Sequence, residues 1–167
     1  MEEMLDVVDA RNEVVRQAPR SVVLKDGLLH RSAHLFVFDR NGNLFVHRRA
    51  ENKEEYPGLW DGSAAGHLSA GEDSRTCIIR EAEEELGLAN IYPVFLREFA
   101  ARKVTCHEFV AFFRTEGVRR RDVIFDPVEM TDGKWLALKE VVADMKRVKY
   151  SPTFRLMLEW YLETFGG

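Results

Sequence analysis

The apolar positions of the chain alternate with polar ones, or form short runs, in several stretches. Such patterns predict β-strands, because alternate side chains of a strand face opposite sides of a sheet. The stretches are 5–8, 13–16, 28–38, 44–49, 92–100, 104–114 and 134–138. Asn41-Gly42 separates two of them and is a strong signal for a tight hairpin turn. The polar segment 50–67, which contains Pro57-Gly58, predicts a loop.

The apolar positions recur with the spacing of a helix elsewhere. The first predicted helix runs from about Asp73 or Ser74 to Leu86 and ends before Gly87, a residue type that suits this position. Two further helices are predicted at about 139–146 and, after Ser151-Pro152, at 153–165. Strands with helices between them predict an α+β protein or an α/β/α sandwich. The 167 residues contain no repeat and no linker, so we expect a single domain, 1–167.

The helix predicted at 73–86 carries a group of acidic residues on one side. At about 100° per residue, three carboxylates fall within roughly 100° of arc. These are Glu81, Glu84 and Glu85, whereas Glu83 points elsewhere. The apolar residues predicted to face the core from the opposite side are Ile79, Ala82 and Leu86. Like charges at positions i and i+4 cost a few tenths of a kcal/mol unless something neutralises them.

Two interpretations of this acidic group are open. Glutamate favours helices, and most runs of glutamate are solvated surface. The segment before the helix favours a second interpretation, because it contributes Gly66, Gly71 and Glu72 at fixed distances. A glycine-containing loop that leads into clustered carboxylates is a good site for a hard cation, since Mg²⁺ prefers oxygen ligands and leaves room for substrate phosphates.

The residues from Gly66 to Leu88, GHLSAGEDSRTCIIREAEEELGL, resemble the signature of the Nudix hydrolases. The match consists of Gly66, Glu72 and the run 80–88, and its one departure is Ala82, where the family usually has a larger aliphatic residue. The resemblance implies a Nudix-type α/β/α sandwich with a mixed central sheet. It also implies hydrolysis of a diphosphate bond in a nucleoside-diphosphate-linked or similar small molecule.

The same resemblance implies roles for particular residues. Glu81, Glu84 and Glu85, together with the backbone carbonyl of Gly66, would hold a divalent cation, either Mg²⁺ or Mn²⁺. The three glutamates and Arg80 are the implied catalytic residues. A carboxylate must accept the proton of the attacking water, and which one does so is open.

Other charged residues have two interpretations each. By resemblance Arg80 and Glu72 form a structural ion pair, although each could equally be a surface charge. A further carboxylate often joins the site from a later loop in this family, and Glu108 and Glu129 are the candidates here, or else solvated residues.

Three basic residues are candidates for binding the diphosphate, namely Arg48, Arg49 and Lys53. Arg48 and Arg49 are adjacent in a predicted strand and therefore point to opposite faces, so we expect at most one of them to face a ligand. Trp60 either stacks on a base of the substrate or packs beneath the loop.

A narrower resemblance covers residues 28–67 and 6–15, which are similar to type-1 isopentenyl-diphosphate isomerase, a Nudix-fold enzyme that moves a double bond. That reaction needs an acid and a base, one of which is a cysteine in the isomerase. The matching position here is Ala65, which cannot transfer a proton.

The isomerase metal site also matches only in part. Of its three histidine ligands, two correspond to His30 and His67, whereas Val23 stands at the third position. Its paired glutamates correspond to Cys106 and Glu108. His30 and His67 are thus either metal ligands or ordinary hydrogen-bonded histidines. We expect a hydrolase related to the isomerase, with isomerase activity or a non-catalytic diphosphate-binding module as the alternatives.

Composition narrows the classes of partner. The net charge of −4 gives no support for binding to nucleic acid or an anionic membrane, and no apolar run approaches membrane-spanning length. The acidic start of the chain is unlike a signal peptide, and two cysteines are too few for a disulfide framework, so we expect a cytoplasmic protein. The family resemblance makes a homodimer conceivable, whereas the substrate is not specified by the sequence.

Overall fold

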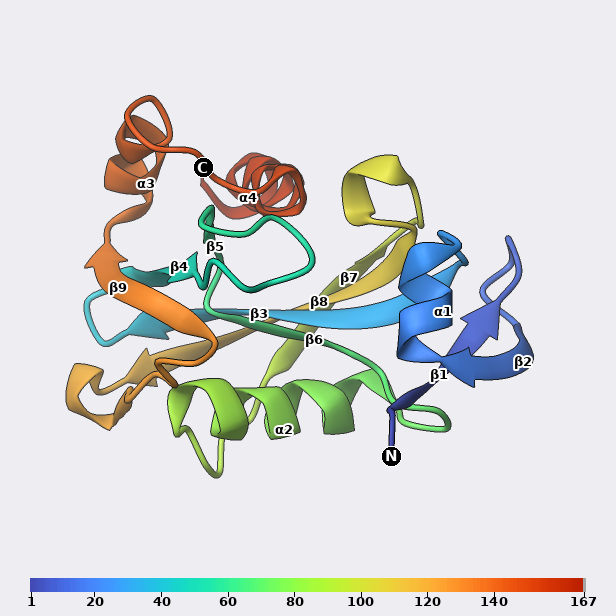
Figure 1. The fold of residues 1–167 in the computed structure, drawn as a ribbon. Coiled ribbons are helices and arrows are strands. Elements are labelled where there is room, and N and C mark those ends of the chain that lie inside the picture. The colour runs from blue at the N-terminus through green and yellow to red at the C-terminus, as the bar shows by residue number, and fades with distance from the viewer. Residues whose placement is uncertain (167) are drawn as a thin grey trace.

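The structure is a computed structural model that describes residues 1–166, and its centre is a mixed β-sheet with helices on both faces (Figure 1). The strands follow the order β5-β4-β3-β8-β7, with β6 also paired to β3 and β9 to β4. Their bounds are β3 His30–Asp39, β4 Leu44–Arg49, β5 Trp60–Asp61, β6 Ala64–His67, β7 Val94–Phe99, β8 Glu108–Val118 and β9 Met130–Leu136. Helix α2 (Ser74–Leu86) covers one face, and α3 (Leu138–Asp144) and α4 (Pro152–Phe165) cover the other. The predicted sandwich is confirmed.

Strand β3 determines where the neighbouring strands carry their side chains. It pairs in parallel with β8, which brings His30 beside Glu108, and antiparallel with β6, which brings His34 beside Ala65. Paired residues of neighbouring strands face the same side of a sheet. Side chains from three strands that are distant in sequence therefore meet on one face of β3.

Helix α2 has the predicted bounds because both of its ends are capped. The Asp73 side chain accepts a hydrogen bond from the backbone N–H of Thr76 at 2.9 Å, and Gly87 adopts the left-handed conformation with φ 65°. The prediction that Ile79 belongs to the core face is wrong. Ile78 and Leu86 are fully buried against the sheet, whereas Ile79 is only partly buried. Ala82 and Leu86 are buried as predicted, and the buried face extends from them towards Ile78 and Glu85 instead of towards Ile79.

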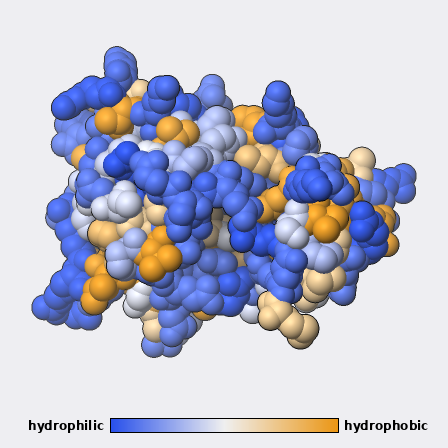
Figure 2. Space-filling model, in the orientation of Figure 1, coloured by the Kyte–Doolittle hydropathy of each residue, from blue (hydrophilic) through white to orange (hydrophobic). Residues whose placement is uncertain are grey.

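On the opposite face, α4 packs its apolar side against aromatic residues of the sheet. Ser151 caps its first turn, with the hydroxyl accepting from the N–H of Phe154, and Pro152 follows at the first helical position. The rings of Phe36 and Phe112 lie 4.6 Å apart, edge to face, beneath this helix. Figure 2 shows that the exposed face of the molecule is mostly hydrophilic, with apolar groups small and separate.

The structure differs from the predicted elements in three places. The segment 50–67 contains the short strands β5 and β6, which its small and polar residues do not indicate. Helix α1 (Arg20–Lys25) was not predicted, because six residues are too short for a periodic pattern. Strand β8 begins at Glu108 instead of 104, because Lys103–Thr105 forms a 3₁₀ turn.

A hairpin of β1 (Met4–Val8) and β2 (Val14–Pro19) lies at the edge of the sandwich, next to α1. Backbone hydrogen bonds connect it to the rest of the chain, from Val8 N to Leu29 O at 2.9 Å and from Ala70 N to Met4 O at 2.8 Å. Among residues 1–166, no helix has both the length and the apolar character needed to span a membrane.

The burial of α2 gives a prediction on stability. Ile78→Ala removes a fully buried side chain and should lower the free energy of unfolding by about 2–5 kcal/mol. Ile79→Ala removes a partly buried side chain and should lower the free energy of unfolding clearly less. Urea unfolding of the two variants measures the difference. Equal losses, or a larger loss for Ile79→Ala, would contradict the orientation of the helix in the structure.

Candidate active site

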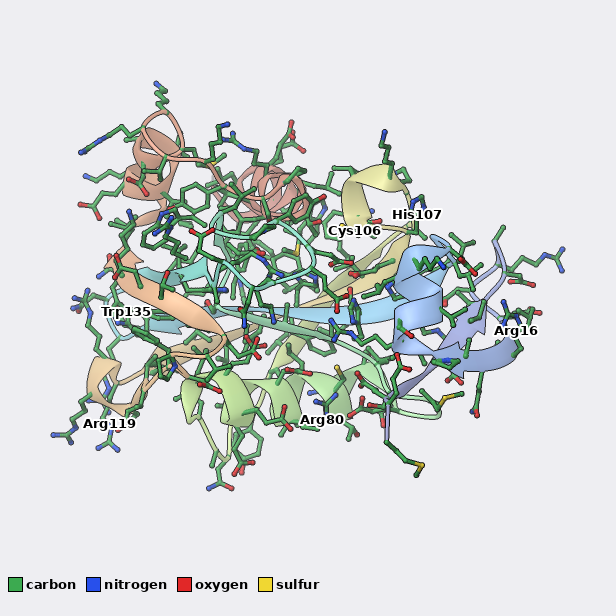
Figure 3. All side chains as sticks on the ribbon, viewed as in Figure 1. Arg16, Arg80, Cys106, His107, Arg119 and Trp135 are labelled. Carbon is green, nitrogen blue, oxygen red and sulfur yellow. The ribbon has the colours of Figure 1, made fainter. Side chains whose placement is uncertain are left out.

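A cavity of about 550 Å³ lies between α2, β6, the start of β8 and the loop 50–59. Arg80 on α2 and Cys106 before β8 line it from opposite sides in the view of Figure 3. Two groups of residues face it. The carboxylate cluster consists of Glu81, Glu84, Glu85 and Glu129. The histidine cluster consists of His30, His34 and His67 around Glu108.

The carboxylate cluster forms where α2 approaches β6 closely. The backbone N–H of Ala65 donates to Glu85 Oε1 at 3.3 Å. A Cβ atom placed on Gly66 would lie 2.0 Å from Glu81 Oε1, so only glycine allows this approach. The Gly66 carbonyl accepts a weak hydrogen bond from the Cys77 thiol at 3.6 Å. The structure thus brings the predicted ligands Gly66, Glu81 and Glu85 together.

The carboxyl groups of this cluster are held under electrostatic strain. Burial, followed by the charge of Glu81, raises the pKa of Glu85 well above its ordinary range. Burial also raises the pKa of Glu81, against the lowering effect of Arg80. Glu84 stays 59% exposed at its side chain, at the mouth of the cavity. A cation would relieve the repulsion between the two inner carboxylates.

Glu129 joins the cluster from the loop before β9. It forms an ion pair with Lys53, and its charge contributes to the raised pKa of Glu85. The backbone N–H of Asp126 donates to Glu85 O at 2.9 Å and fixes this loop against the end of α2. Of the two interpretations open for Glu129, the structure favours a residue of the site over a solvated one.

Arg80 is surrounded by carboxylates. Its Nε and Nη2 atoms donate to Glu72 Oε1 and Oε2 at 2.9 and 3.0 Å, a bidentate pair that matches the expected structural role. Its Nη1 atom donates to Glu81 at 2.7 Å and lies 3.4 Å from Glu84. Arg80 therefore positions Glu81 and partly neutralises the cluster.

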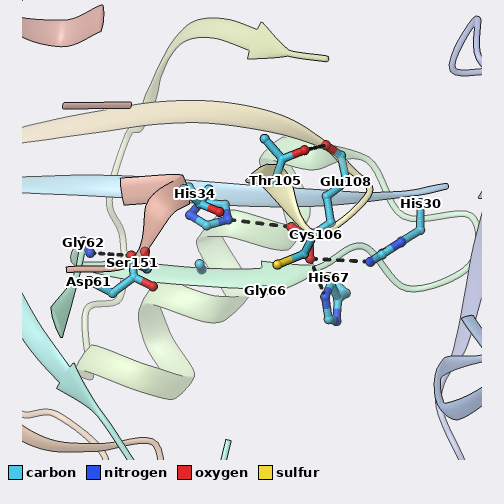
Figure 4. Close-up of polar contacts among 12 residues, drawn as sticks. His30, His34, Asp61, Gly62, Gly66, His67, Thr105, Cys106, Glu108 and Ser151 are labelled. Atoms are coloured by element: carbon cyan, nitrogen blue, oxygen red, sulfur yellow. Dashed lines mark hydrogen bonds and ion pairs between the residues drawn. The ribbon is translucent and has the colours of Figure 1, made fainter. Parts of the chain in front are cut away.

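The histidine cluster surrounds one buried carboxylate, as Figure 4 shows. Glu108 Oε1 lies 2.8 Å from His67 Nε2 and 3.5 Å from His30 Nε2, and Glu108 Oε2 lies 3.9 Å from His34 Nε2. Although burial alone would raise it, the pKa of Glu108 is held well below its usual range by His67 and its neighbours. One ring or carboxylate atom from each of His30, His67 and Glu108 lies within 4.8 Å of the others, a spacing that suits a metal ion.

Sequence reasoning identified His30 and His67 but missed His34. Val23, the residue at the expected third histidine position, is fully buried among apolar side chains of the N-terminal hairpin and faces no ligand. His34 approaches Glu108 from β3 instead. Strand alternation could have predicted His34, because positions 30, 32 and 34 of one strand face the same side of the sheet.

The basic residues divide as strand alternation requires. Arg49 lines the cavity and donates to Asp61 at 3.3 Å, and Lys53 lines it beside Glu129. Arg48 points away and pairs with the exposed Glu51 at 2.9 Å. The structure therefore does not bring Arg48 to the site with the other two.

Two other residues are placed plainly by the structure. Trp60 is buried, 6.4 Å from the ring of Tyr150, so it packs beneath the loop. Cys106 faces the cavity with its Sγ atom 3.3 Å from Tyr56 Oη. Tyr56 and Cys106 both have positive φ, 48° and 54°, which is uncommon for residues other than glycine.

The chain matches the NUDIX domain over residues 28–160. It is 32% identical to an uncharacterized Nudix hydrolase of Yersinia pestis over 141 residues, 84% of this chain and 76% of that protein. It is 31% identical to an isopentenyl-diphosphate Delta-isomerase of Dinoroseobacter shibae over 148 residues, 84% of each chain. The crystal structure of DR0079 from Deinococcus radiodurans superposes with a TM-score of 0.81 at 25% identity, covering 94% of this chain and 98% of that one. The chain therefore belongs to the Nudix hydrolase family, with isomerase-named proteins among its relatives.

Proposed function

We propose that the protein hydrolyses a diphosphate bond of a small molecule with the aid of Mg²⁺ or Mn²⁺. The observation that supports this most strongly is the carboxylate cluster. Glu81 and Glu85 lie close together with raised pKa values, and the Glu81 side chain fills the place that a side chain on Gly66 would take. A folded chain that holds like charges in this way at a cavity destabilises itself unless a cation binds there.

The donor set fits a hard divalent cation. Glu81, Glu84, Glu85 and Glu129 offer carboxylate oxygens, and Gly66 offers a backbone carbonyl. A divalent ion bound there would neutralise phosphoryl charge and make a water molecule more acidic. Carboxylate ligands suit Mg²⁺ and Mn²⁺ alike.

The remaining residues would bind the substrate and accept the proton of the attacking water. Arg49 and Lys53 face the cavity as cations and would hold phosphoryl oxygens of the diphosphate. Glu81 is our candidate for the group that accepts the proton of the attacking water, because it lines the cavity and Arg80 fixes its position. Arg80 holds Glu81 in place through the 2.7 Å hydrogen bond.

Isopentenyl-diphosphate isomerisation is the second candidate, and the histidine cluster is the observation that favours it. His30, His67 and Glu108 occupy positions that resemble the isomerase metal site, and two relatives with that name are 30% and 31% identical. Against it stands Ala65, which lies beside His34 on β6 and supplies no proton. The hydrolase therefore remains the function that we propose.

The first test removes the charge of the metal site. Changing both Glu84 and Glu85 to glutamine should lower metal-dependent phosphate release from diphosphate substrates by at least about 100-fold, because two oxygen ligands lose their charge. Phosphate release is measured with Mg²⁺ and with Mn²⁺, on nucleoside diphosphate conjugates and prenyl diphosphates. Glu83→Gln, on the exposed side of the same helix, is the matched control. Full activity of the double variant would contradict the proposal.

A second test uses the pH dependence of stability without metal. The pKa of Glu85 lies above its ordinary 4.5 in the folded chain, so its charge opposes folding, and this penalty appears as the pH rises above 4.5 towards the folded value. Glu85→Gln should therefore become more stable than the natural chain with rising pH, by about 1.4 kcal/mol for each unit of the shift. Urea unfolding between about pH 5 and pH 8 measures this. Parallel curves for the two proteins would contradict the electrostatic account.

A third test separates hydrolysis from isomerisation. The protein is incubated with isopentenyl diphosphate and Mg²⁺ in deuterated water, and the products are analysed for deuterium and for the dimethylallyl isomer. We expect neither deuterium incorporation nor the dimethylallyl isomer at enzymatic rates, because loss of a catalytic acid or base typically lowers the rate by about 10²–10⁴-fold. Turnover at ordinary rates would overturn the hydrolase proposal.

A further inference from the structure

Glu55 differs from every other carboxyl group of the cavity. Within residues 1–166, each of the others that line the cavity has a hydrogen bond or ion pair to its side chain. They are Glu3, Glu54, Asp61, Glu81, Glu84, Glu85, Glu108, Asp126 and Glu129. The side chain of Glu55 has none in this part of the chain. The Glu55 carboxyl group is half-buried at the cavity, so a ligand that enters can replace its water with a hydrogen-bond donor.

The backbone at Glu55 and at the residue after it is held, which keeps its carboxyl group at the cavity. Arg49 Nε donates to the Glu55 carbonyl at 2.9 Å. The next residue, Tyr56, has φ 48° and contacts Cys106 across the cavity wall at 3.3 Å. Positive φ at a residue other than glycine persists only where the surroundings enforce it.

The charges around Glu55 indicate the kind of ligand. The charged and titratable groups that face it are Glu108, His67, His30 and Arg49. Arg49 is already engaged with Asp61 and with the Glu55 backbone, and the two histidines lie against Glu108. Burial and the neighbouring carboxylate of Glu108 both raise the pKa of Glu55. A group that donates hydrogen bonds and carries positive charge would satisfy Glu55, whereas an alkyl group would leave it unpaired.

The cavity connects this position with the carboxylate cluster. Strand β6 runs along both regions, since the Ala65 N–H contacts Glu85 and His67 contacts Glu108 two residues later. A substrate whose diphosphate lies at the carboxylate cluster can therefore reach the histidine cluster and Glu55 within the same cavity.

We propose that Glu55 determines substrate specificity by accepting a hydrogen bond from an amino group on the substrate. The substrate class is then a diphosphate ester whose organic part carries an amine. This inference rests on the proposed hydrolase function for the placement of the diphosphate. Glu55 selects the substrate and takes no part in bond cleavage.

The test compares matched ligands. A series of ω-aminoalkyl diphosphates is assayed with Mg²⁺ against the n-alkyl diphosphates in which a methyl group replaces the amine. For at least one chain length the natural protein should prefer the amine by about 10-fold or more in kcat/KM, the effect of one hydrogen bond to a charged group. Glu55→Leu should abolish this preference and leave kcat/KM for the alkyl diphosphate unchanged or higher. Glu51→Gln, an exposed residue of the same loop, should keep the preference.

Two further measurements keep the outcomes distinct. If Glu55→Leu fails to fold, Glu55→Gln replaces it, because glutamine retains the shape and loses the charge, and it should reduce the preference. Calorimetry also measures binding of the non-hydrolysable methylene bisphosphonate analogues of each pair. This binding reports on Glu55 even if no diphosphate is hydrolysed. The absence of hydrolysis would overturn only the hydrolase proposal.

The inference is overturned if hydrolysis or binding shows no preference for the amine at any chain length. It is also overturned if Glu55→Leu and the natural protein show the same preference. A third contrary result would be that Glu55→Leu weakens binding of Mg²⁺ alone and of both ligands equally, because Glu55 would then be a metal ligand.

Discussion

The close approach of β6 to α2 is the constraint on which the site depends. Gly66 faces Glu81 at a distance that excludes any side chain, and the neighbouring N–H of Ala65 reaches Glu85. This contact aligns β6 so that its next residue, His67, reaches the other buried carboxylate, Glu108. A larger residue at position 66 would displace the Glu81 side chain and so disturb the carboxylate cluster.

The two clusters show how surroundings determine the behaviour of the same side chain. Glu85 and Glu108 are both buried glutamates at one cavity, yet their pKa values shift in opposite directions. Glu85 lies among other carboxylates, so its charge is repelled, whereas Glu108 lies among three imidazoles, so its charge is stabilised. The carboxylate cluster therefore carries repulsion that a cation would relieve, whereas Glu108 already has partners. This difference places the proposed chemistry at α2.

The sequence predicted those parts of the site that lie close together in the chain. The capped helix with Glu81 and Glu85 follows from local spacing and from Asp73 and Gly87, which act within their own turns. His34 was missed because strand pairing brings it to the site, and Glu55 was missed because a loop conformation does so. Ile79 was placed in the core because the predicted core face lay opposite the three carboxylates, whereas Glu85 is itself buried. Polar residues buried for function are where a hydrophobic pattern misleads.

The polar character of the histidine cluster bears on the choice between hydrolase and isomerase. An isomerase of a branched hydrocarbon needs an apolar surface for the chain and an acid and base on its two faces. Here the residue beside Ala65 on the next strand is His34, and the cavity wall near it includes the ionisable Glu55 and Cys106. Hydrocarbon placed against Glu55 would take water from a carboxyl group that has no partner within residues 1–166, which costs about 1–3 kcal/mol. The polar lining of the cavity thus supports the proposed hydrolysis over isomerisation of a prenyl chain, in addition to the alanine at position 65.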